Sequence, residues 1–141
     1  MNRQSAVAAY LVAEPFTRAL HIVREALART DLSIIAELDV SDRIRRQVSL
    51  GFAPCRILLV DSPYLLLEAV ALDRSAAVLL PLHIVVSSRG PETLVHWLNA
   101  AAITGAALPA GAAGPLEKLQ EQVAHVLGAV AIRQDQCQPV S

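Results

Sequence analysis

Two short polar residues at the end of an apolar run are the first candidates for chemistry. Asp61 and Ser62 follow the segment "CRILLV" and precede Pro63. Their side-chain oxygens could accept hydrogen bonds from the free N–H groups that begin a helix, and a proline suits the first helical turn. The same N–H groups and the helix dipole could instead bind an anion. Because neither a glycine-rich phosphate loop nor a Gly-x-Ser-x-Gly elbow accompanies them, we expect a helix cap, with ligand contact left open.

Cys55 and His83 are the second candidate pair. Both fall in apolar segments that predict strands, and a thiolate beside an imidazole is a nucleophile pattern. The pair could work together only if the two strands are neighbours, and a cysteine in an apolar strand is usually an inert core residue. The four histidines show no metal-binding spacing, and the sequence holds neither HExxH nor CxxC. We therefore expect no metal site and assign no catalytic residue.

Apolar periodicity predicts the elements that would position these residues. The most secure helix has Phe16, Leu20, Val23 and Leu27 at spacings of four, three and four. A short helix is expected between Ser41 as its N-cap and Gly51 as its stop. The expected strands are 6–13, 32–40, 55–60, 76–88 with an interruption at Pro81, and 93–99. The expected helices are 15–30, 41–51, 63–72 and one from Pro115 onward.

The order of these elements predicts an α+β fold. The sequence β-α-β-(α)-β-α-β-β-α mixes helical crossovers with one hairpin, so we expect a two-layer sandwich in which helices pack on one face of a mixed β-sheet. A chain of 141 residues fits one domain, which we place at residues 1–132. The polar segment 133–141 is expected to be a flexible C-terminal tail.

The central part of the chain resembles a known family. The segment "RILLVDSPYLLLEAVALDRSAAVLLPLHIVVSS" is similar to the signature of domain-of-unknown-function family 302 (DUF 302), in which a strand, a tight turn and a helix lead to a strand that reads "LLP". The matching residues are Ser62–Pro63, Asp73 and Leu79–Leu80–Pro81, and the likeness covers roughly residues 5 to 130. The resemblance implies a small two-layer α/β domain that commonly forms homodimers. It implies no reaction.

Composition narrows the classes of partner. Hydrophobic residues make up 54% of the chain and charged residues 18%, and excess apolar surface of this kind favours a homodimer. A net charge of −1 provides no field for nucleic acid. No stretch has the roughly 20 strongly apolar residues of a membrane helix, so we expect no membrane association. Two cysteines do not make a disulfide framework, which suits a cytoplasmic protein.

These observations favour a small-ligand-binding or protein-interaction module without catalysis. If a ligand pocket exists, we expect it near the 61–63 turn and the interruption at Pro81. The polar residues expected to line it are Cys55, Arg56, Asp61, Ser62 and His83. The alternative is a small enzyme that uses Cys55 or His83 on a small-molecule substrate. No cofactor can be named from the sequence.

Overall fold

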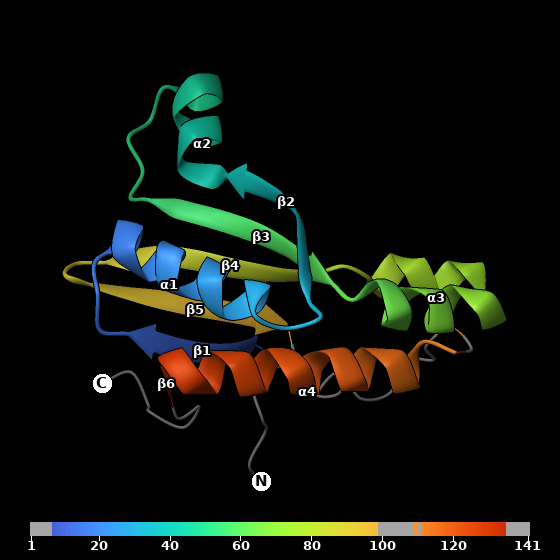
Figure 1. The fold of residues 1–141 in the computed structure, drawn as a ribbon. Helices are drawn as coiled ribbons and strands as arrows, with labels where there is room; N and C mark the ends of the chain where they lie inside the picture. Colours follow the sequence, from blue (N-terminus) through green and yellow to red (C-terminus); the bar gives the residue numbers. More distant parts are fainter. Residues whose placement is uncertain (1–6, 99–108, 110, 135–141) are drawn as a thin grey trace, which may run out of the picture.

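The computed structural model describes residues 7–98, 109 and 111–134, which form one open sheet covered by helices (Figure 1). The strands are β1 (Val7–Val12), β2 (Ser33–Asp39), β3 (Cys55–Asp61), β4 (Leu82–Arg89), β5 (Glu92–Leu98) and β6 (Ile132–Arg133). The helices are α1 (Phe16–Ala28), α2 (Val40–Val48), α3 (Pro63–Leu72) and α4 (Ala113–Val130), with a 3₁₀ helix η1 (Arg74–Leu79) after α3. Among the described residues, no helix is both long and apolar enough to cross a bilayer.

The six strands lie in the order β2-β3-β4-β5-β1-β6. Every neighbouring pair is antiparallel, so the expected α+β fold is confirmed but the sheet is not mixed. A helix between two strands usually signals a parallel crossover. Here α2 connects β2 to β3, and α3 with η1 connects β3 to β4, and both strand pairs are antiparallel neighbours. These helices are therefore insertions in the connections between adjacent antiparallel strands rather than crossovers between parallel strands.

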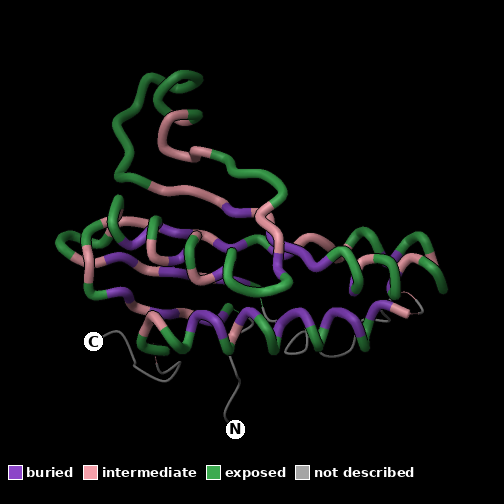
Figure 2. The backbone as a smooth tube through the Cα atoms, viewed as in Figure 1, coloured by how far each residue is buried: buried purple, intermediate pink, exposed green. Residues whose placement is uncertain are grey.

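Helices α1 and α4 pack side by side on one face of the sheet, as expected (Figure 1). The alternation of strand side chains places one set of residues beneath them, including Leu58, Ile84 and Val95, each with no exposed surface. The apolar stripes of the helices, including Val23 and Leu119, complete this core. Figure 2 shows the buried residues concentrated between these two layers.

Three local predictions need correction. The strand expected from residue 76 begins only at Leu82, because Asp73 accepts a hydrogen bond of 2.9 Å from the backbone N–H of Ser75 and starts η1. Pro81 thus precedes the strand instead of interrupting it. Helix α2 is capped by Asp39 and not by Ser41, and it ends at Ser49 with a φ of 57° before Gly51 is reached.

The C-terminal segment also contributes to the sheet. Strand β6 pairs with β1 through Arg133 and Ile132, and the backbone N–H of Gln134 donates to the carbonyl of Ala9 at 2.8 Å. The sheet therefore includes a residue beyond the predicted domain end at 132. The division into a domain and a flexible tail stays a prediction, and residues 135–141 lie outside the described part of the chain.

Candidate functional site

The five residues predicted to line one pocket are distributed along the sheet. Cys55 and Arg56 begin β3, whereas Asp61 ends it and Ser62 follows. Six residues of strand span about 20 Å, so the two ends of β3 cannot line the same small cavity. His83 lies on β4 opposite Leu59, nearer to the Asp61 end. The structure does not bring the five residues together, and ligand contact by any of them stays a prediction.

Cys55 and His83 do not form a nucleophile pair. The register of β3 and β4 places Cys55 opposite Ser87, four positions from His83, which corresponds to about 13 Å along the strand. Burial raises the pKa of the Cys55 thiol, and the nearby carboxylate of Asp39 raises it further. The thiol therefore has neither His83 as a base nor the lowered pKa that would make it reactive.

Arg56 belongs to a network of charged side chains at the edge of the sheet. Its Nη2 donates to Oδ2 of Asp39 at 3.0 Å, and its Nη1 lies 3.6 Å from Oε1 of Glu37. Arg24 on α1 donates from Nε to Oε2 of Glu37 at 2.9 Å. This hydrogen bond is the main cause of the lowered pKa of Glu37. The network joins α1, β2 and β3, and its contacts are those of a structural cluster.

Asp61 and Ser62 are buried, with 6% and 3% of their surface exposed. Ser62 occupies the N-cap position of α3, but its side chain makes no capping hydrogen bond, so that part of the prediction is wrong. Pro63 has no N–H, and the backbone carbonyl of Ser62 accepts from Leu66 at 2.9 Å. Burial raises the pKa of Asp61, whose carboxylate makes no hydrogen bond or ion pair with another described residue.

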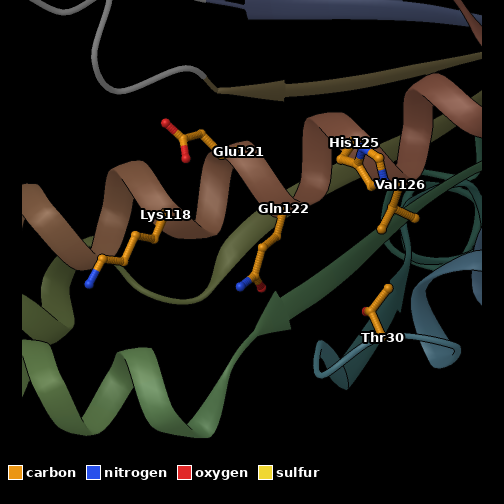
Figure 3. Close-up of a pocket in the computed structure, with 6 residues that line it drawn as sticks. All are labelled: Thr30, Lys118, Glu121, Gln122, His125 and Val126. Carbon is orange, nitrogen blue, oxygen red and sulfur yellow. The ribbon is translucent and has the colours of Figure 1, made fainter.

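A cavity of about 340 Å³ lies instead beside α4, where the turn between α1 and β2 approaches the helix (Figure 3). Gln122 and Val126 extend from α4 toward Thr30, while Lys118 points toward α3 and the Glu121 carboxylate points away from Gln122. A volume of this size is enough for one small molecule. The lining residues are Thr30, Lys118, Glu121, Gln122, His125 and Val126.

The polar groups around this cavity differ in their freedom to bind. Thr30 is fixed, since its Oγ1 donates to the carbonyl of Leu27 at 2.7 Å and accepts from the N–H of Leu32 at 3.1 Å. Lys118 holds Glu68 of α3 with its Nζ 3.3 Å from Oε1. The side chains of Gln122 and His125 make no hydrogen bond with other described residues. The amide of Gln122 and the imidazole of His125 are therefore available to a polar ligand, whereas the ammonium group of Lys118 is paired with Glu68.

The comparisons with known proteins fit this fold. Residues 9–130 match the family model described as "Domain of unknown function DUF302". The chain belongs to the DUF302 family. Its structure is similar to the crystal structure of an uncharacterized conserved protein DUF302 from Bacillus stearothermophilus, with a TM-score of 0.75 and 14% sequence identity. The similarity covers 90% of this chain and 99% of that chain, and it supports the α+β fold alone. No curated protein matches the chain.

Sequence reasoning missed the α4 cavity of this DUF302 domain for a physical reason. Gln122 and His125 lie on the polar side of the amphipathic helix α4. The spacing of polar residues on this side is the same as on any helix face that is exposed to solvent. Only the approach of Thr30 from another element makes the surface concave. Within the described residues, no three His, Cys, Asp or Glu side chains gather in a way that could hold a metal ion.

Proposed function

We propose that this DUF302 chain is a cytoplasmic, homodimeric module that binds a small polar ligand against α4 without catalysing a reaction. The observation that carries the proposal is the cavity of about 340 Å³, whose Gln122 and His125 have no hydrogen-bond partner among the described residues. A concave site with an apolar wall and a few polar groups is the usual form of a small-molecule site. Val126 supplies an apolar wall here.

The absence of catalysis is proposed from the state of Cys55. An enzyme that uses this thiol needs a lowered pKa and a base within hydrogen-bond reach. The raised pKa of Cys55 and its register distance from His83 favour the binding module over that alternative. A cytoplasmic location is consistent with a free thiol at Cys55.

Thermal-shift screening tests the ligand proposal. The panel would contain amino acids, nucleotides, sugar phosphates, dicarboxylic acids, haem and divalent metal ions, each added singly. We expect at least one compound to raise Tm by several degrees, since a ligand at 100 times its Kd contributes about 2.7 kcal/mol. The double variant Gln122→Ala/His125→Ala should lose this shift. A matched control, His21→Ala, changes an exposed histidine of α1 and should keep it. A panel without any compound whose shift is lost in the double variant contradicts the proposal.

The homodimer is proposed from the sheet face opposite α1 and α4. Strands of an antiparallel sheet that are covered on one side normally carry polar residues on the other. In this chain the alternate positions are largely apolar, and Val7 and Leu98 are 43% and 46% exposed. No described helix covers these positions. The apolar residues on this open face include Val7, Leu11, Ile57, Leu59, Val85, Leu94 and Leu98.

A protruding arm, which consists of α2 and the segment that follows it up to β3, gives a second reason to propose a dimer. Helix α2 has no buried residue, and it stands away from the sheet in Figures 1 and 2. The following segment exposes Leu50 and Phe52 by 59% and 53%. Exposed apolar groups of this size are typical of surfaces that a partner covers. A second copy of the chain could cover both the arm and the open face.

Molar mass in solution tests the dimer. Size-exclusion chromatography with light scattering should give the mass of two chains for the unchanged protein. The variant Val85→Lys/Leu94→Lys places charges on the open face and should give the mass of one folded chain. Ala129→Lys adds a charge at an exposed position of α4 and should remain dimeric. A monomeric unchanged protein, or a double variant that remains dimeric, contradicts the proposed interface.

A further inference from the structure

A second cavity, of about 230 Å³, lies on the other side of α4 between the helix and strands β1, β5 and β6. It shares only Glu121 with the cavity of Figure 3, whose carboxylate points away from Gln122 in that view. Its inner wall includes Ala8, Trp97 and Gln120, and its outer part includes Glu117, Glu121 and Arg133.

The inner wall carries one buried polar group without a partner. Trp97 is only 5% exposed, and its indole Nε1–H is buried without a hydrogen-bond acceptor. Gln120 is 6% exposed, and its Nε2 donates to the carbonyl of Leu98 at 3.2 Å. An unsatisfied buried donor destabilises a protein. A ligand that carries a hydrogen-bond acceptor would satisfy the Nε1–H of Trp97.

The outer part of the cavity is charged. Glu117 and Glu121 are one helical turn apart on α4, and both are exposed. Arg133 on β6 supplies a guanidinium group, which favours carboxylate ligands. Two carboxylates and one guanidinium complement a ligand that carries two cationic groups and one carboxylate. Neither a nucleotide nor a dicarboxylic acid has this charge pattern.

We propose that this cavity binds a basic α-amino acid, the class that includes lysine and ornithine. The ligand carboxylate would accept from Arg133 and from the Nε1–H of Trp97. Its two ammonium groups would donate to Glu117, Glu121 and the amide oxygen of Gln120. The volume holds one molecule of this size. The proposal uses residues other than Gln122 and His125, so it is independent of the ligand site proposed above.

Trp97 makes the proposal directly measurable, because it is the only tryptophan in the chain. Titration with L-lysine should change the intrinsic fluorescence with a Kd below about 1 mM. Two analogues test which charged groups of L-lysine are needed for binding: 1,5-diaminopentane lacks the carboxylate, and L-norleucine lacks the side-chain amine. Each should bind at least tenfold more weakly than L-lysine. The absence of saturable binding, or equal affinity for the three compounds, overturns the proposal.

Variants connect the binding to this cavity. Glu117→Gln/Glu121→Gln and, separately, Arg133→Gln should each raise the Kd for L-lysine at least fivefold by calorimetry. Trp97→Phe removes the indole donor and should do the same; its folding is checked by circular dichroism. Glu25→Gln changes an exposed carboxylate of α1 and should leave the Kd within twofold. The double variant Gln122→Ala/His125→Ala should also leave it unchanged, which separates this test from that of the other cavity. Unaltered binding in the carboxylate and arginine variants overturns the assignment.

Discussion

Nη2 of Arg56 lies 3.0 Å from Oδ2 of Asp39, and the two residues are register partners on β3 and β2. The other oxygen of Asp39 accepts from the N–H of Asp42 at 2.9 Å and from the hydroxyl of Ser41 at 2.7 Å. One carboxylate therefore caps α2 and also holds the edge strand to its neighbour. The hydrogen bond from the Asp42 N–H is the largest cause that lowers the pKa of Asp39 to about 2.

The thermal stability of the protein should depend on the ionisation of the Asp39 carboxylate. Because the pKa of Asp39 is lower in the folded chain than its ordinary value of about 4, its stabilising effect is complete above pH 4. The effect is lost as the pH falls from about 4 to about 2. Asp39→Asn should lower Tm at pH 7 and make Tm less sensitive to pH below 4. The control Asp31→Asn, at an exposed position, should retain the steep acid dependence. Parallel curves for Asp39→Asn and the unchanged protein would show that the contacts do not stabilise the fold.

Asp61 should affect the pH dependence of stability in the direction opposite to Asp39. Burial raises its pKa in the folded state, so the folded chain binds a proton more readily than the unfolded chain. Stability from this group therefore falls as the pH rises through the unfolded value of about 4. Asp61→Asn should raise Tm at pH 7 by about 2 °C or more, and the difference should vanish near pH 3. A lower Tm for the variant at pH 7 would mean that the ionised carboxylate makes a stabilising contact.

Cys55 should react slowly. A raised pKa leaves little thiolate at pH 7.5, and the side chain is partly buried. In a Cys137→Ser background, which leaves one thiol, iodoacetamide should modify Cys55 at least tenfold more slowly than free glutathione. Unfolding in guanidinium chloride should restore the rate. Alkylation of the folded protein faster than that of glutathione would favour the enzyme hypothesis.

Gly111 should tolerate no side chain. Its φ is +81°, and a Cβ there would lie 2.8 Å from Cβ of Leu72 and 3.2 Å from the carbonyl oxygen of Ala69. Gly111→Ala should therefore destabilise the protein by about 1–3 kcal/mol in urea unfolding. Gly128 is the matched control, since nothing lies within 4 Å of a Cβ at that exposed position of α4. Gly128→Ala should be stabilising by about 0.5–1 kcal/mol. Equal effects of the two substitutions would contradict this account of how α4 packs against α3.

The elements with regular apolar patterns were predicted well from the sequence. The spacing of Phe16, Leu20, Val23 and Leu27 identified α1, because burial of one helix face imposes a period on its residues. The continuous apolar run from Cys55 identified β3, because such runs are typical of buried strands. The strand expected at 76–88 was wrong at its start. Apolar residues such as Val78 indicated burial there, yet Val78 is 83% exposed on η1. The periodic signal cannot tell a sheet from a short helix in so apolar a segment.

The sequence by itself determined the family, the α+β class and the helices that cover the sheet, since these follow from local patterns and a matching segment. Only the tertiary structure decided that every described strand pair is antiparallel and that Cys55 lies four register positions from His83. It also placed the two cavities on either side of α4, one lined by Gln122 and Thr30 and the other by Gln120 and Trp97. Strand register and cavities join residues far apart in the chain, and no local pattern of side chains encodes these distances.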